Sequence, residues 1–95
     1  MITVYVSIGN SDDKLTQAEW QTYQLSVRAL LRKHASEVHG EWYSAPTAQY
    51  QNACFCVVLR DGDLAEMIKM RISETRETFR QDSAAWAEVP VTQFI

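Results

Sequence analysis

The sequence predicts an α+β domain: a four-stranded antiparallel sheet with two helices on one face. The apolar patterns follow one another along the chain as strand, helix, strand, strand, helix, strand. Right-handed crossovers turn this order into a ferredoxin-like sandwich, in which the strands lie side by side in the order 4-1-3-2. The composition of the strands agrees, because the third strand is the most apolar and should be central. Pro90 and the charged pair Glu37 and Glu41 fall in the two predicted edge strands, where they discourage edge-to-edge pairing.

Length and charge restrict the class of protein. The chain has 95 residues, enough for one domain over residues 1–95, and 46% of them are hydrophobic. The net charge is −3 without any cluster of Lys or Arg, so we expect no nucleic-acid partner. No run approaches the ~20 apolar residues of a membrane span, and the N-terminal residues lack the features of a signal peptide. We therefore expect a cytoplasmic protein with no membrane partner.

The first strand and the first helix have clear signals. Apolar residues alternate with polar ones over residues 2–8, which predicts a strand with one buried face. Thr16 and Glu19 have the spacing of a capping box, and Leu15 with Trp20 has that of a hydrophobic staple. The helix that follows carries one apolar stripe, formed by Trp20, Tyr23, Val27, Leu30, Leu31 and His34.

The second half of the chain predicts a hairpin, a helix and a last strand. Residues 37–44 alternate, residues 45–48 break the pattern, and residues 50–59 are apolar on both faces, as in a central strand. Asp61-Gly62 then turns the chain, and Asp63 with Glu66 has the spacing of a second helix cap. The predicted inner stripe of that helix consists of Leu64, Met67, Ile68, Ile72, Thr75 and Phe79. Residues 84–95 predict a strand that Pro90 interrupts.

Three connections meet at one end of this fold and offer a candidate ligand-binding site. They are residues 9–15, the hairpin loop at 45–50 and residues 81–84. The candidate ligand-binding residues that they bring together are Asn10, Ser11, Asp12, Asp13, Tyr43, Tyr50, Asn52, Asp82 and Ser83, and Gln51 lies beside them. The aspartates could coordinate a cation or accept hydrogen bonds from a ligand. Gly, Asn and Asp are also typical of turns, and acidic residues before a helix favour its positive end, so we favour a simple connector.

The two cysteines are the other candidates for chemistry. Cys54 and Cys56 project from the same face of a strand about 7 Å apart, too far for a disulfide. With His39 on the neighbouring strand they could bind zinc, or one of them could act as a nucleophile. No second pair completes a ligand set and no catalytic signature surrounds them, so core packing is favoured. We expect no catalytic set, no metal and no cofactor.

The face of the sheet that the helices leave open is the candidate interface. Thr3, Tyr5 and Ser7 should point away from the helices, as should Asn52, Cys54, Cys56 and Val58 on the third strand. The pattern does not decide on which face of the sheet Trp42, Tyr43 and Trp86 lie. The candidate interface residues are Tyr5, Cys54, Cys56 and Trp86. Such a patch is larger than an ordinary monomer exposes, so we expect self-association as a homodimer or docking on a protein partner.

Four segments also resemble a known group of proteins. They are "VYVSIGNSDDKLTQAEW", "HGEWYSAP", "YQNACFCV" and "RQDSAAWAEV". Together they resemble segments of a small family of uncharacterised proteins of actinobacteria and their phages, over most of the chain. The resemblance implies an intracellular accessory protein, encoded by a phage or by its host. It implies nothing about catalytic residues.

These observations favour a non-enzymatic binding protein. It would modulate a protein partner or sequester a small ligand, through the open face or the clustered loops. The alternative is a small enzyme or ligand-binding domain with its pocket at the loops. In that alternative Asp12 or Asp13 serves as base or cation ligand, and Tyr43, Asn52 and Ser83 orient the ligand. A purely structural subunit is a third hypothesis.

Overall fold

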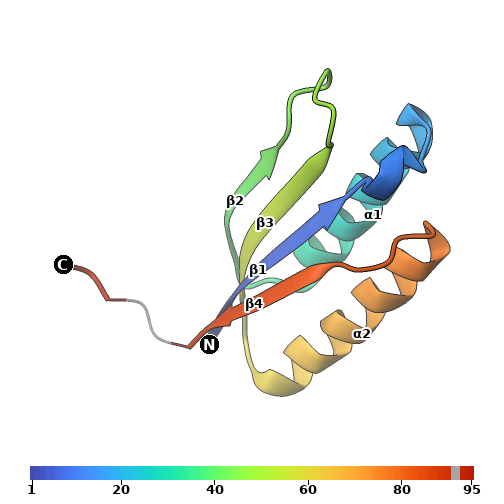
Figure 1. Ribbon diagram of the computed structural model, residues 1–95. Helices are drawn as coiled ribbons and strands as arrows, with labels where there is room; N and C mark the ends of the chain where they lie inside the picture. Colours follow the sequence, from blue (N-terminus) through green and yellow to red (C-terminus); the bar gives the residue numbers. More distant parts are fainter. Residues whose placement is uncertain (91–92) are drawn as a thin grey trace.

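The predicted order of elements is confirmed. The structure is a computed structural model that describes residues 1–90 and 93–95 (Figure 1). Its elements in chain order are β1 (Ile2–Gly9), the short 3-10 turn η1 (Ser11–Asp13), α1 (Gln17–His34), β2 (Glu37–Tyr43), β3 (Asn52–Leu59), α2 (Gly62–Thr78) and β4 (Ala85–Val89). The described helices include none that is long and apolar enough to span a bilayer.

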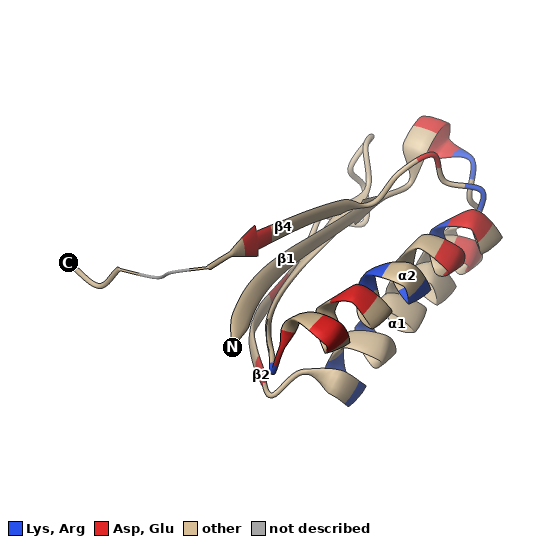
Figure 2. Ribbon diagram, turned by 90° about the horizontal axis from the view of Figure 1, so that it is seen from below, with Lys and Arg blue, Asp and Glu red and all other residues tan. Residues whose placement is uncertain are grey.

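The four strands form one antiparallel sheet with β1 and β3 at its centre. The order is β2-β3-β1-β4, which is the predicted order 4-1-3-2 counted from the other edge. Both helices lie on the same side of this sheet, and most Lys, Arg, Asp and Glu residues lie on the helices and loops (Figure 2). The other face of the sheet is covered by no element of the described chain.

The core lies between the sheet and the helices. Alternate residues of the central strands point into it, including Val4 and Val6 of β1 and Phe55 and Val57 of β3, all at most 1% exposed. The helices contribute one stripe each, and the buried members are Trp20, Tyr23, Val27, Leu31, Ala65, Ile68 and Ile72. Side chains alternate along a strand, so the residues between these core residues point to the opposite face of the sheet.

The predicted N-terminal cap is confirmed for α1 and is wrong for α2. At α1 the capping box is present: the Glu19 N–H donates to Thr16 Oγ1 (3.1 Å) and the Thr16 N–H donates to Glu19 Oε1 (3.0 Å). At α2 the cap is Asp61, which accepts from the Leu64 N–H at 2.9 Å, so the predicted cap at Asp63 is wrong. The helix begins two residues earlier than predicted, because its first residue is Gly62 and not Leu64.

Both edge strands depart from the prediction. β4 ends at Val89, directly before Pro90, so the predicted strand over residues 84–95 is too long. Residues 93–95 are not strand, and residues 91–92 lie outside the described residues. On β2, Glu41 is not a free edge charge: its side chain is 11% exposed and pairs with Arg28 (3.0 Å) and Arg32 (2.7 Å) of α1. This ion-pair cluster, which also accepts from the Tyr43 hydroxyl, fastens the edge strand to the helix.

Opposing effects act on the carboxyl group of Glu41. Burial raises its pKa, but hydrogen bonds from Arg32 and Tyr43 and the charge of Arg28 outweigh that effect. The pKa therefore lies below its ordinary value, and Glu41 stays ionised when it pairs with α1.

One buried hydroxyl group has no partner. Tyr23 is fully buried, stacked on Phe79 with ring centroids 4.9 Å apart and edge-on to Trp20 at 6.1 Å. Its hydroxyl oxygen makes no hydrogen bond within the described residues. Burial raises the pKa of Tyr23 to about 12, with Arg76 opposing the shift.

We expect Tyr23→Phe to raise the free energy of unfolding by about 1 kcal/mol at neutral pH, because it removes an unsatisfied buried polar group. The difference should widen above pH 10. The folded pKa of about 12 exceeds the ordinary value of 10.0, so the wild type loses stability as pH rises through this window and the variant lacks that loss. Urea unfolding at pH 7, 10 and 11 measures both effects. A variant clearly less stable than the wild type would mean that the hydroxyl has a partner.

Candidate functional site

Asn10, the first predicted site residue, is a buried structural residue. Its side-chain oxygen accepts from the Leu15 N–H at 2.9 Å, and its amide nitrogen donates to the Leu15 carbonyl at 3.2 Å. The same nitrogen contacts Gln51 Oε1 (3.3 Å) and Asp13 Oδ1 (3.4 Å). The amide of Asn10 therefore closes the loop between β1 and α1, and its hydrogen-bonding groups are used inside the protein.

Three glutamines, Gln17, Gln51 and Gln81, complete this arrangement; none of them is among the nine predicted ligand-binding residues, although the sequence places Gln51 beside them. Gln17 and Gln51 exchange a pair of amide hydrogen bonds at 3.0 and 2.8 Å, which joins the start of α1 to the start of β3. Gln81, 3% exposed, accepts from the Ser11 N–H at 2.8 Å and joins the α2–β4 loop to η1. Local sequence carries no signal for these pairs, because their partners are 34 and 70 residues apart.

The two aspartates face solvent in the connector. Asp12 and Asp13 are exposed and have φ values of 55° and 53°, in the left-handed region that Asp tolerates better than most residues. Across the described ranges, no group of three or more His, Cys, Asp or Glu side chains could hold a metal ion. The geometry agrees with the favoured interpretation of this loop as a connector.

The nine predicted ligand-binding residues do not form one pocket. Asn10, Ser11, Asp12, Tyr50 and Asn52 line a shallow hollow of about 230 Å³, together with Gly9 and Gln51. Tyr43 lies on the other side of the hairpin and lines a separate hollow with α1. Asp13, Asp82 and Ser83 line neither, and Asp82 pairs with Lys14 at 3.5 Å. The loops thus meet where the topology places them, but their side chains do not converge.

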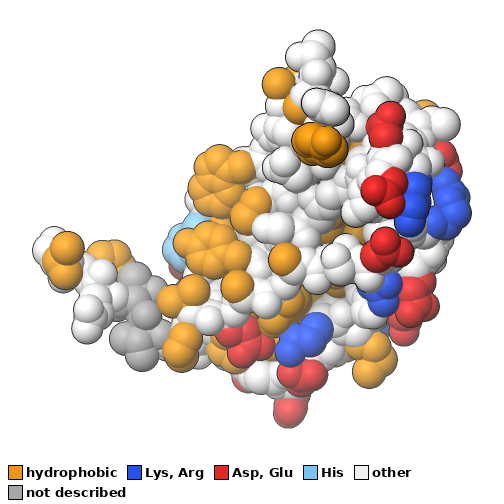
Figure 3. All heavy atoms as spheres, viewed as in Figure 1, with side chains coloured by type: hydrophobic (Ala, Val, Ile, Leu, Met, Phe, Trp, Pro, Cys, Tyr) orange, Lys and Arg blue, Asp and Glu red, His pale blue; other side chains and the backbone are white. Residues whose placement is uncertain are grey.

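The open sheet face carries mostly uncharged residues, many of them apolar. Cross-strand partners point to the same side, so the register defines the face. Its residues are Thr3, Tyr5, Ser7 and Gly9 of β1, Asn52, Cys54, Cys56 and Val58 of β3, Glu37, Gly40 and Trp42 of β2, and Ala85, Ala87 and Val89 of β4. Figure 3 views this side and shows hydrophobic side chains gathered over the sheet, with most acidic and basic ones along one margin.

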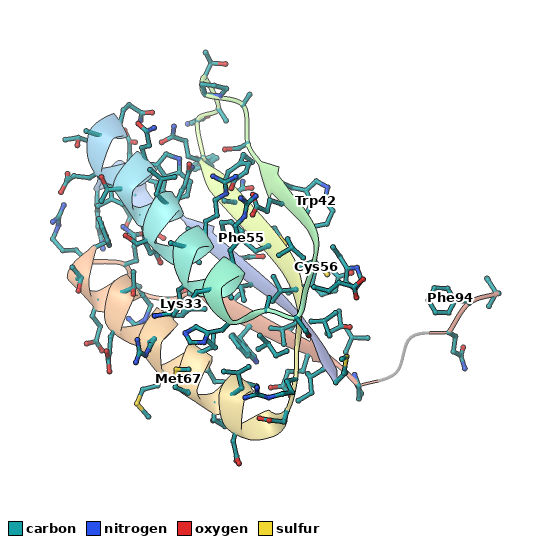
Figure 4. The ribbon with its side chains drawn as sticks, turned by 180° about the vertical axis from the view of Figure 1, so that it is seen from behind. Lys33, Trp42, Phe55, Cys56, Met67 and Phe94 are labelled. Atoms are coloured by element: carbon teal, nitrogen blue, oxygen red, sulfur yellow. The ribbon has the colours of Figure 1, made fainter. Side chains whose placement is uncertain are left out.

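Trp42 and Tyr5 provide the exposed aromatic area of this face. Trp42 is 54% exposed and Tyr5 is 42% exposed. The Trp42 ring lies back over Gly40, where a Cβ atom would come within 2.7 Å of it. Seen from the helix side, Trp42 points away from α1 beyond the edge of β2, whereas Phe55 lies on the covered side (Figure 4).

Trp86, a predicted interface residue whose side of the sheet the sequence left open, does not lie on the open face. Trp86 pairs with Val6, whose side chain is in the core, and so it points toward α2. There Lys69 lies over its ring at 5.4 Å and its indole N–H donates to Glu88 at 3.0 Å. The other three predicted interface residues, Tyr5, Cys54 and Cys56, do lie on the open face. Both cysteines are free, and Cys56 is 3% exposed.

We expect Asn10→Ala to lower the free energy of unfolding by about 1–3 kcal/mol, because it leaves the Leu15 N–H and carbonyl without their buried partners. Asn52→Ala is the matched control. Asn52 is exposed and its side chain donates only to the Tyr50 carbonyl, so its loss should cost less than about 0.5 kcal/mol. Urea denaturation of both variants makes the comparison. Equal losses would contradict the structural role assigned to Asn10.

Comparison with known proteins bears on the fold. No family model matches the sequence, and no curated protein gives a significant match. Among solved structures, the chain is similar to an uncharacterized NIPSNAP domain protein from Burkholderia xenovorans, with a TM-score of 0.55 and 10% identity over 100% of this chain and 98% of that one. A putative amidohydrolase/peptidase from Burkholderia cenocepacia matches with a TM-score of 0.37 and 10% identity, over 93% of this chain and 26% of that one; it carries no argument. The resemblance to actinobacterial and phage proteins is untested and stays a prediction. What the first similarity does show is the fold: this chain is a ferredoxin-like α+β domain.

Proposed function

We propose that the chain is a non-enzymatic binding protein that acts through its open sheet face, and that two copies associate through this face as a homodimer. The observation that supports this proposal is the exposure of Trp42 and Tyr5 on a face with few charges. Large aromatic side chains at half exposure are the residues that most often supply binding energy in protein interfaces.

The charge distribution supports association on this side rather than on the helices. By register, Glu37 is opposite Val58 at one corner of the face, and the inner positions are uncharged or apolar. The helix layer, in contrast, carries ion pairs such as Lys69–Glu66 and Arg80–Glu19. Interface cores are depleted of charged residues, so the sheet face is the better candidate for a buried surface.

A second copy of the chain is the partner that this face fits best. Stacked sheets pack about 10 Å apart with interdigitating side chains, and a flat apolar sheet face suits that arrangement. A two-fold axis would place each patch on the same patch of the other copy, so that one surface serves both sides. The dimer would cover the partly exposed Cys54, whereas Cys56 is already buried, and two free thiols suit a reducing compartment such as the cytoplasm.

The biological role that we propose is that of an accessory factor, encoded by a phage or by its host. It would modulate a protein partner or sequester a small ligand. The alternative of an enzyme with its pocket at the loops has less support. The amide of Asn10 is used within the protein, Asp12 and Asp13 are exposed, and the described residues include no group of three or more His, Cys, Asp or Glu that could hold a metal ion.

We expect Tyr5→Lys and Trp42→Lys to weaken the dimer at least about hundredfold, because each places a desolvated, unpaired ammonium group in the contact. Met70→Lys is the control. Met70 is 63% exposed on α2, in the opposite layer, so the same change there should leave the association constant unaltered. Small-angle scattering and sedimentation over a range of concentrations give the mass. A monomeric wild type at high concentration, or variants with an unchanged mass, would contradict the proposal.

A further inference from the structure

A second surface hollow, away from the open sheet face, has the composition of a ligand site. It lies between the first half of α1 and the β2–β3 hairpin and has a volume of about 370 Å³. This volume falls within the range of small-molecule sites, at its lower end. Its lining residues are Gln17, Trp20, Gln21, Gln24, Tyr43, Ser44, Pro46 and Gln51. None of them carries a formal charge.

Four of the lining residues are glutamines, and they differ in how firmly they are held. Gln17 and Gln51 are fixed by their reciprocal amide pair, and Gln51 is in addition held by Asn10. Gln21 and Gln24 form no side-chain hydrogen bond with any other residue in the ranges 1–90 and 93–95, so their donors and acceptors are free. Each amide offers both a carbonyl acceptor and two N–H donors, which matches groups that donate and accept at once, as hydroxyls do.

An aromatic ring forms one wall of this hollow at a fixed position. Tyr43 meets Phe55 at 88° with ring centroids 5.9 Å apart, and its hydroxyl donates to Glu41 at 3.1 Å. These two contacts hold the ring, yet Tyr43 remains 46% exposed. Trp20 also lines the hollow at 4% exposure. Within the described residues, its indole N–H donates to no protein group.

We propose that this hollow binds a neutral sugar ring. The apolar C–H face of a sugar packs on an exposed aromatic ring, and its hydroxyls exchange hydrogen bonds with amides. The hollow offers both groups together, with no formal charge that would select an anion or a cation. The hollow is on the helix side of the sheet, because Tyr43 pairs with Ala53, which is buried in the core. Sugar binding therefore does not depend on the association proposed for the open face.

The test is a titration of the full-length, isotope-labelled protein followed by NMR. The probes are glucose, galactose, N-acetylglucosamine and cellobiose at millimolar concentrations, with sorbitol as the ring-free control of similar hydroxyl content. We expect at least one of the four sugars to cause saturable shifts of the Trp20 indole and of the Gln17, Gln24 and Gln51 side-chain amides. Sorbitol should not cause them, since it lacks a rigid ring face.

Matched variants locate the binding. Gln24→Ala should weaken the affinity by about 2- to 10-fold, the loss of one hydrogen-bonding group, and Tyr43→Leu by at least as much. Tyr50→Leu, which removes a 76% exposed tyrosine outside this hollow, should leave it unchanged. The proposal is overturned if none of the four sugars shifts these resonances. It is also overturned if sorbitol shifts them equally, or if Gln24→Ala, verified as folded, binds with unaltered affinity.

Discussion

The structure depends on one constraint: two helices cover one face of a four-stranded sheet, and no other element of the described residues covers the opposite face. The central strands nevertheless place apolar side chains on both sides of the sheet. β1 places Val4 and Val6 in the core and Tyr5 on the outside, and β3 does the same with Phe55 and Cys56. A sheet covered on one side normally alternates apolar and polar residues. The apolar outer residues of β3 depart from that pattern, and this departure is the physical reason to look for a partner on this face.

The exposed area on the open face is concentrated in a few rings rather than spread evenly. Cys56 and Val58 point outward and yet are only 3% and 6% exposed. Trp42 contributes to this shielding, because its ring lies over Gly40, the residue opposite Cys56 in the register. A side chain at position 40 would push the ring away. The glycine thus lets one large side chain form a flat aromatic surface, which is the arrangement that concentrates binding energy in a small number of contacts.

The fold was predictable from the sequence because its signals are local. Alternation over residues 2–8, the capping box at Thr16 and the apolar run of β3 each determine an element, and the handedness of crossovers determines the topology. The side of Trp86 and the end of β4 were not predictable in this way, since they depend on register and on where pairing with β1 stops. The glutamine pairs were not predictable either. They join α1, β3 and the α2–β4 loop, and hydrogen bonds between such distant segments leave no trace in local periodicity.

Gln51 connects the architecture of the loops to the chemistry of the hollow. Its backbone carbonyl accepts from the Asn10 N–H at 3.0 Å, and its side chain contacts both Asn10 and Gln17. Gln51 therefore supports the β1–α1 connection that Asn10 closes, and it also forms part of the wall of the hollow. Such a wall is stiff before any ligand arrives, which reduces the entropy lost on binding. It also means that a change at Asn10 would alter stability and the hollow together. Gln24, whose amide makes no hydrogen bond with the rest of the described chain, is the residue at which binding can be separated from folding.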